Sequence, residues 1–152
     1  MDAIDHRLLA QLQQDASLTN QALADIVGLS PSACLKRVKR LWDSGIIERQ
    51  VVLVDPAAVG LCMHMVVEVT MERDRKDLYA RFLKRAMAIQ EVKQCYQVTG
   101  EVDFVLIVEV PDMDAYDRFC DELLYVDDNV RKFRTLISRD RKKFDTAIHR
   151  LP

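Results

Sequence analysis

Residues 28–41 read GLSPSACLKRVKRL, and this stretch decides the fold of the N-terminal part of the chain. Ser30 is a good helix N-cap, and Pro31 suits the first helical position, where its missing N–H costs nothing. Gly28 can adopt the left-handed conformation that ends a preceding helix. The stretch therefore predicts the turn and the second helix of a helix-turn-helix, with this helix ending at Gly45.

The residues before this stretch have the spacing of two further helices. A first apolar stripe repeats every three or four residues and ends near Asp15. Thr19 is a plausible N-cap for a short second helix that ends at Gly28. The residues of the first stripe are Ile4, Leu8, Leu9 and Leu12.

Four cations lie close together in the third helix of a chain whose formal net charge is −2. Helical spacing places Cys34, Val38 and Leu41 on the inner side, and we expect the bases Lys36, Arg37 and Arg40, with Ala33, to point outward together. A solvated helix face is the commoner explanation of a charge run taken alone. On the second helix of a helix-turn-helix, however, arginine can pair with guanine and lysine can meet phosphate in a major groove.

The segment that follows predicts a wing and then a boundary. Residues 46–54 are rich in β-branched side chains, which favours a small β-element beside the helices. Asp55-Pro56 and Gly60 then break the pattern. We predict a DNA-binding domain over residues 1–54 and a linker over residues 55–60.

The second half of the chain changes from helical to mixed periodicity. The pattern predicts a ferredoxin-like α+β domain over residues 61–138, followed by a C-terminal tail over residues 139–152. The expected elements are strand 61–71, helix 75–89, strands 92–98 and 103–110, a helix capped by Asp112 and strand 130–138.

The expected strands are apolar on both faces, although a sheet of this kind has helices on one face only. In strand 103–110, Phe104, Leu106 and Val108 point to one side, whereas Val105 and Ile107 point to the other. One apolar face is left without cover from the same chain. We therefore predict self-association through the sheet.

Composition excludes several classes of protein. No apolar run approaches the roughly 18 residues that a membrane span needs. The acidic start, Met1 to Asp5, lacks the regions of a signal peptide, so we expect a cytoplasmic protein without a membrane partner.

Cysteine and histidine give no pattern typical of catalysis or of metal binding. Cys34, Cys62, Cys95 and Cys120 are scattered, without the short gaps of paired ligands, and we interpret them as small buried hydrophobes. Cys62 and His64 lack the further ligands that zinc requires. An enzyme that uses Cys95 or Cys62 as nucleophile and His64 as base would also need a group that orients the base, and the sequence indicates none. We predict neither enzyme activity nor a metal or cofactor.

Several motifs together resemble the Lrp/AsnC family of bacterial and archaeal transcription regulators. They are DAIDHRLLAQLQQD at 2–15, LSPSACLKRVKRLWDSGII at 29–47 and CYQVTGEVD at 95–103, with VDP and VPDMDAY in matching positions. The resemblance spans nearly the whole chain. It implies a winged helix-turn-helix joined to a ferredoxin-like effector domain that dimerises through its sheet and often builds octamers.

On this basis we expect binding to pseudo-palindromic double-stranded DNA, with half-sites roughly 34 Å apart. Hydroxyls, amides and free N–H groups near helix starts suit phosphate oxygens, and a basic residue in the wing adds a contact. The expected DNA-binding residues are Asn20, Ser30, Ser32, Lys36, Arg37, Arg40 and Arg49.

The stretch Thr99-Gly100-Glu101-Val102-Asp103 permits two interpretations. It is by itself a tight turn, with a positive φ at Gly100 and turn amides bonded by Asp103. The resemblance instead implies an amino-acid effector site, in which Asp103 meets the ammonium and amides near Gly100 meet the carboxylate. Matched positions add Gln97, Thr99, Met113, Leu136, Ile137 and Ser138, although Met113 and Leu136 are equally compatible with a core.

The alternative function is an architectural DNA-compacting protein that assembles through the same sheet but senses no effector. The sequence leaves open the effector, the operator, the sign of regulation and the choice between dimer and octamer.

Overall fold

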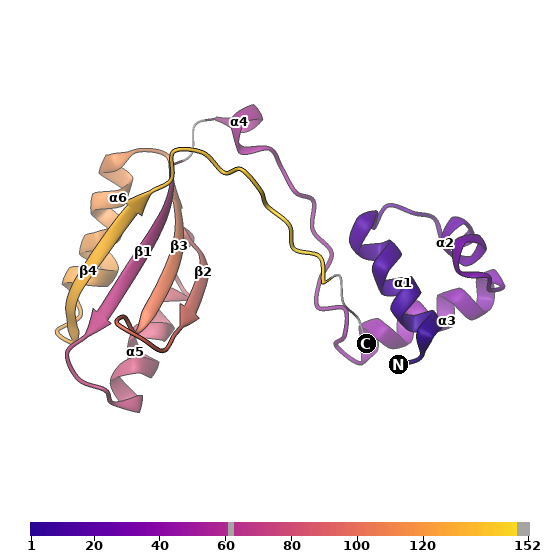
Figure 1. Cartoon of the computed structure of the whole chain (residues 1–152), viewed down its shortest axis with the longest axis horizontal. Helices are drawn as coiled ribbons and strands as arrows, with labels where there is room; N and C mark the ends of the chain where they lie inside the picture. Colours follow the sequence, from indigo (N-terminus) through magenta and orange to yellow (C-terminus); the bar gives the residue numbers. More distant parts are fainter. Residues whose placement is uncertain (61–62, 149–152) are drawn as a thin grey trace. The chain divides into compact units, whose positions relative to one another are not determined.

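Three helices at the N-terminus pack around one apolar core (Figure 1). They are α1 (Ala3–Gln14), α2 (Asn20–Val27) and α3 (Pro31–Asp43). The computed structural model describes residues 1–60 and 63–148. The buried residues of this core are Leu8, Leu9, Leu23, Ala24, Val27, Cys34 and Leu41.

Local capping explains where these helices begin and end. The Thr19 hydroxyl accepts a hydrogen bond from the Ala22 amide at 3.2 Å, and the Ser30 hydroxyl accepts one from Ala33 at 3.3 Å. Gly28 has a φ of 74°, the left-handed conformation that lets the chain turn sharply between α2 and α3. The predicted caps and the helix-turn-helix are confirmed.

The segment after α3 differs from the prediction of a β-element. Residues 46–54 contain no strand, and Val51, Val52, Leu53 and Val54 are all exposed. A strand is stable only when a neighbouring strand or packed layer supports it, and this segment has no strand partner among the described residues. A short helix, α4 (Pro56–Val59), follows it.

In the second half, four strands of the described chain form one antiparallel sheet in the order β2-β3-β1-β4. This order and the intervening helices confirm the ferredoxin-like α+β expectation. Residues 61–62, the expected start of the first strand, and with them Cys62, lie outside the described residues. The elements are β1 (Met63–Met71), α5 (Lys76–Ala86), β2 (Val92–Gln97), β3 (Phe104–Val110), α6 (Met113–Phe119), its π-helical continuation η1 (Cys120–Tyr125) and β4 (Val130–Ile137).

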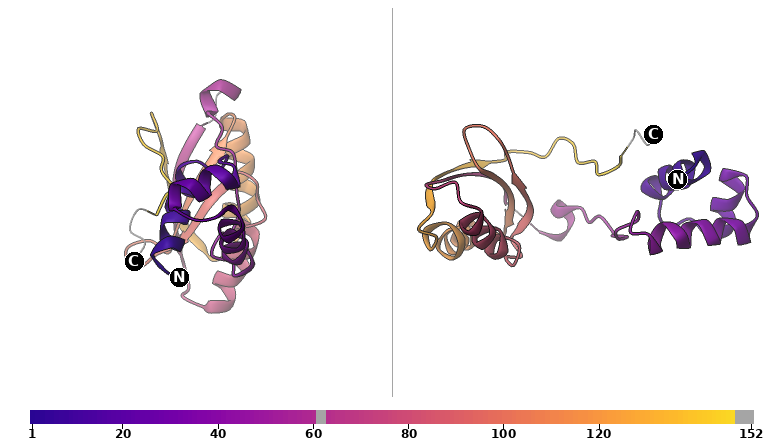
Figure 2. Two further views of the ribbon diagram at one scale, coloured as in Figure 1. Left: turned by 90° about the vertical axis from the view of Figure 1, so that its right-hand side faces the viewer. Right: turned by 90° about the horizontal axis from the view of Figure 1, so that it is seen from below.

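Helix α5 and helix α6 with its continuation η1 cover the same face of the sheet, as the two orientations in Figure 2 show. Alternate residues of β1 and β3 are buried beneath them, whereas Val66, Ile107 and their neighbours on the other face are not. Phe82 from α5 packs against Phe104 from β3 with ring centroids 4.9 Å apart. On α5, Tyr79 is also buried against the sheet.

The chain divides into two compact units, one of residues 1–53 with the C-terminal segment from Lys143 and one of residues 54–142. In the first unit, the Gln13 side chain accepts a hydrogen bond from the Ile148 amide at 2.7 Å and donates one to the Ile148 carbonyl at 3.3 Å. The C-terminal segment is therefore part of the helical unit. Across residues 1–60 and 63–148, no helix combines the length and the apolar character needed to cross a membrane.

Candidate nucleic-acid interface and ligand-binding region

The outward face of α3 carries two lysines and one large apolar side chain. Ser32, Leu35, Lys36 and Lys39 are spaced by three, one and three residues, which places them on one side of the helix. All four are exposed. Within the described residues neither lysine forms an ion pair, so both charges are available to an anionic partner.

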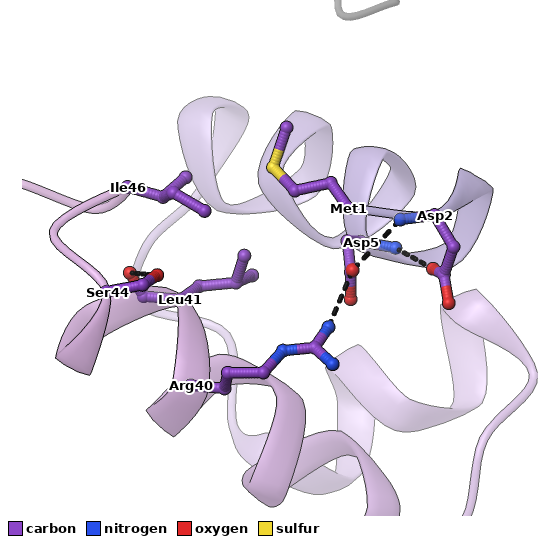
Figure 3. A pocket seen from close by; sticks show the side chains of 7 residues that line it. All are labelled: Met1, Asp2, Asp5, Arg40, Leu41, Ser44 and Ile46. Carbon is purple, nitrogen blue, oxygen red and sulfur yellow. Dashed lines mark hydrogen bonds and ion pairs between the residues drawn. The ribbon is translucent and has the colours of Figure 1, made fainter.

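The two arginines of α3 turn instead toward the beginning of α1. Arg37 donates from Nη1 to Asp2 at 2.7 Å and to Asp5 at 2.8 Å, and Arg40 donates from Nη2 to Asp5 at 2.6 Å. Figure 3 shows the Arg40 guanidinium reaching the Asp5 carboxylate in an open pocket that is also lined by Met1, Leu41, Ser44 and Ile46. Asp5 is only 1% exposed, so the arginines tie α3 to α1 through a buried carboxylate.

The charges in this cluster reinforce one another. Burial acts to raise the pKa of Asp5, but hydrogen bonds from the Asp2 amide and Arg37, with the charge of Arg40, outweigh it and hold that pKa below its usual value. Hydrogen bonds from the Asp5 amide and from Arg37 lower the pKa of Asp2 to about 2. Both carboxylates are therefore ionised at neutral pH.

The prediction that Arg37 and Arg40 share an outward face with Lys36 is wrong as to their orientation, because Asp5 draws both guanidinium groups toward α1. A DNA contact by either arginine stays a prediction. The sequence held a signal for this arrangement: Asp5 lies three and four residues before Leu8 and Leu9, on the inner stripe of α1, and a carboxylate in such a position needs a cationic partner. Leu35 also lies on the outward face, although its apolar side chain gives no sign of this in the sequence.

The other expected DNA-binding residues surround the helix starts. The Asn20 side-chain amide donates to the Pro31 carbonyl at 2.8 Å, which joins the beginnings of α2 and α3. The Ser30 hydroxyl caps α3 and lies 3.3 Å from the Ser32 hydroxyl. Arg49 is exposed beyond the end of α3. Asn20 and Ser30 thus have structural contacts, whereas Ser32 and Arg49 face solvent.

In the second unit, residues 98–103 form the turn between β2 and β3. Gly100 has the expected positive φ, 139°, and the Val98 amide donates to the Asp103 carbonyl at 2.9 Å. The expectation that the Asp103 carboxylate bonds amides of the turn is wrong: one oxygen accepts from the Met71 amide at 2.7 Å, and the other accepts from the Tyr79 hydroxyl. Asp103 therefore holds the turn against β1 and α5. Burial, followed by this hydrogen bond, raises the pKa of Tyr79 to about 12.

The expected effector residues fall into two groups at opposite ends of the sheet. Gln97 pairs with Phe104 beside the turn that contains Thr99 and Gly100, whereas Ile137 pairs with Met65 at the other end of β1. Met113 begins α6, shortly after β3 ends at Val110. At about 3.3 Å per residue, the length of β3 separates the two ends by roughly 20 Å. One chain therefore does not bring the whole set together: Gln97, Thr99, Gly100 and Asp103 lie at one end, and Met113, Leu136, Ile137 and Ser138 at the other.

The open face of the sheet has an apolar row between two polar pairs. Val66 lies opposite Ile107 on one side and Leu136 on the other. His64 lies 3.4 Å from Glu109, and Arg134 pairs with Glu68 at 2.6 Å. An apolar centre with a polar rim is typical of protein interfaces.

The cysteines of the described chain do not resemble reactive or metal-binding groups. Cys34 and Cys120 are buried, and burial raises the pKa of both thiols and of Cys95. A raised pKa disfavours the thiolate that a nucleophile requires. No group of three or more potential metal ligands occurs among residues 1–60 and 63–148.

Comparison with known families covers both units. A family model described as a winged helix-turn-helix DNA-binding domain matches residues 1–48, and one described as the Lrp/AsnC ligand binding domain matches residues 64–148.

Individual relatives extend the match across the chain. An uncharacterised HTH-type transcriptional regulator of Sinorhizobium fredii is 41% identical over 97% of this chain and 88% of its own length. The leucine-responsive regulatory protein of Escherichia coli is 34% identical over 94% of this chain and 87% of its own length. The crystal structure of a Neisseria meningitidis transcriptional regulator in complex with L-Met has a TM-score of 0.88 and 32% identity, covering 97% of this chain and 96% of the other. The chain therefore belongs to the Lrp/AsnC family and is a DNA-binding transcriptional regulator with a ligand-binding domain.

Proposed function

We propose that this protein is a sequence-specific regulator whose DNA affinity or assembly responds to an amino acid. The observation that carries the DNA part is the outward face of α3, where Lys36 and Lys39 have no ion-pair partner in the described chain and lie on the same side of the helix as Leu35. Lysines so placed neutralise phosphates, and the N-terminal half of a recognition helix contacts base edges. The arginine cluster with Asp5 fixes α3 on α1 and so orients this face.

The amino-acid part rests on the ligand-binding domain and on its relatives, of which one is named leucine-responsive and another was crystallised with L-Met. We place the effector near the turn of residues 98–103, where Thr99, Gly100 and Glu101 are exposed and backbone amides of the turn would donate to its carboxylate. Because Met113 and Leu136–Ser138 lie at the far end of the sheet, their participation requires a second copy of the chain. The effector site of this proposal is composite, formed by the turn of one copy and the β4 end of another.

Two surfaces support assembly into a homodimer or a larger oligomer such as an octamer. The apolar row of Val66, Ile107 and Leu136 is left uncovered by the helices. Residues 51–54 add four consecutive exposed aliphatic side chains. Burial of such area is the main driving force for association, and a closed dimer would present two copies of α3 to a pseudo-palindromic operator.

One observation favours the alternative, an architectural DNA-binding protein without an effector response. Each oxygen of the Asp103 carboxylate already accepts a hydrogen bond, from Met71 or from Tyr79. Asp103 therefore has a structural role that does not require an effector. The raised pKa of Cys95, in contrast, argues against a catalytic thiol, so we propose a regulator and not an enzyme.

The test of the function is a mobility-shift titration of the full chain on DNA from its own promoter region, at two salt concentrations, with and without a mixture of the twenty amino acids. A specific shift that the mixture alters supports the proposal. A specific shift that ignores the mixture favours the architectural alternative, and the absence of any specific shift contradicts sequence-specific binding to that DNA.

The composite effector site has its own test, in which two defective variants are mixed. Thr99→Asp and Met113→Asp each place a negative charge at an exposed position in one of the two groups, and each is expected to abolish calorimetric binding of the responsive amino acid. When the two variants are refolded together, about a quarter of the sites combine intact halves, because each site draws on two chains. Recovery of about that fraction supports a shared site, and no recovery contradicts it.

A further inference from the structure

One large side chain on the outward face of α3 is apolar. Leu35 is 59% exposed, while its neighbour Cys34 and the later Leu41 are buried in the core. A single exposed leucine is ordinary on a protein surface. Leu35 differs because it lies in the N-terminal half of α3, in sequence between Ser32 and the exposed Lys36 and Lys39.

The charges around Leu35 select the kind of partner that this surface fits. Two lysines on the same stripe favour a polyanion over an apolar protein surface. Arg37 and Arg40, the side chains best suited to forked recognition of guanine, are held by Asp5 and point toward α1. What remains beside the two lysines is a branched aliphatic group, and the apolar group that double-stranded DNA presents in its major groove is the C5-methyl of thymine.

We propose that Leu35 is a specificity-determining residue that contacts a thymine methyl in each half-site, with Lys36 and Lys39 placed on the adjoining phosphates. The inference rests on the proposed sequence-specific DNA binding and adds to it the base that α3 prefers. The contact involves no hydrogen bond, because neither the leucine side chain nor the thymine methyl donates or accepts.

The experiment removes the methyl groups one at a time. The preferred duplex is first selected from a random-sequence pool with the full chain. Each thymine is then replaced, at symmetric positions, by deoxyuridine, which keeps the base pair and lacks only the methyl. Binding is measured by fluorescence anisotropy at constant salt.

The expected result is a position at which loss of one methyl weakens binding about fourfold and loss of the symmetric pair about fifteenfold, since burying one such group is worth roughly 0.8 kcal/mol. Leu35→Ala should lose this sensitivity while retaining the effects of base changes elsewhere. Leu35→Met, which keeps a large apolar side chain, should retain it. Ile26→Ala is the matched control, because Ile26 is a similarly exposed aliphatic residue of α2, at 51%, and it should leave the methyl effect unchanged.

Three outcomes would overturn the inference. The wild-type protein could be indifferent to every methyl, or Leu35→Ala could keep the full methyl effect. Leu35→Ala could also change only self-association, which would assign Leu35 to a protein contact. Failure of the selection to yield any preferred duplex would instead contradict the proposed function itself, so the two failures are distinguishable.

Discussion

A buried carboxylate at the start of α1 determines which basic side chains of α3 are available to a partner. Asp5 binds Arg37 and Arg40 and also accepts from the Asp2 amide at 3.1 Å. Both oxygens are thereby satisfied, as a buried charge requires. Arg37 and Arg40 consequently position α3, whereas Lys36 and Lys39 remain in solvent.

Asp5→Asn is expected to destabilise the helical unit by about 2 kcal/mol, because Arg40 loses its ionic partner and Arg37 loses one of two. Trp42, the one tryptophan of the chain, lies in α3, so its fluorescence during urea unfolding reports on this unit. Asp43→Asn, at an exposed carboxylate in the same helix, is the control and should change stability by less than about 0.5 kcal/mol. Equal effects of the two variants would contradict a structural role for Asp5.

The same cluster predicts a dependence on pH. The pKa of Asp2 is about 2 in the folded chain against an ordinary 3.8. A carboxyl whose folded pKa is depressed adds stability above its unfolded pKa and loses it as the pH falls through the folded pKa. The advantage of wild type over Asp2→Asn in urea unfolding should therefore be complete at pH 5 and vanish toward pH 2. An advantage that stays constant over this interval would show that Asp2 acts only as a neutral helix cap.

Among the single elements, the sheet has an open apolar face, and a charge placed on that face should disrupt self-association. Val66 sits at its centre, between Ile107 and Leu136. Val66→Glu should lower the assembly state of the protein, measured by light scattering after size exclusion, because a carboxylate in an apolar interface must be desolvated. Met87→Glu is the control, since Met87 is an exposed apolar residue beyond the end of α5. An unchanged mass for Val66→Glu would remove this face from the interface.

The elements that the sequence predicts well are those with local signals. Thr19, Gly28, Ser30 and Asp112 cap helices where they were expected to, because capping depends on residues within one turn. The alternating burial of β3 likewise follows from its own pattern. The features that local signals do not predict depend on distant partners. The Asp5 cluster joins two helices, Asp103 accepts a hydrogen bond from Tyr79 of another element, and residues 46–54 have no strand to pair with in the part of the chain that the structure describes.

The π-helical continuation η1 was also not predicted. Its buried side chains, Cys120, Leu123 and Leu124, continue the inward side of α6, and their spacing in the sequence is compatible with an ordinary α-helix. The candidate site shows the same division. The outward position of Lys36 follows from the helical period of α3. The separation of Leu136–Ser138 from the turn of residues 98–103 follows from the order of the strands in the sheet, which a periodic sequence pattern does not define.

At the scale of the whole molecule, the chain passes twice between its two units, near residue 53 and again near residue 142. The second passage follows β4, which carries Leu136 and Ile137, and leads to the segment that ends in the Gln13–Ile148 hydrogen bonds. The ligand-binding unit is thereby joined to the DNA-binding unit at both ends of its sequence. A regulator whose ligand alters DNA binding needs such a physical connection between two sites.

The salt dependence of DNA affinity, measured for three forms of the protein, shows whether the outward face of α3 contacts DNA. Lys36→Ala combined with Lys39→Ala should flatten the log–log slope by about 0.9 for each phosphate contact removed. Lys84→Ala combined with Lys132→Ala, at lysines of the ligand-binding unit, should leave the slope of the wild type. If the first pair of substitutions leaves both slope and affinity unchanged, the outward face of α3 does not contact DNA and the central claim is contradicted.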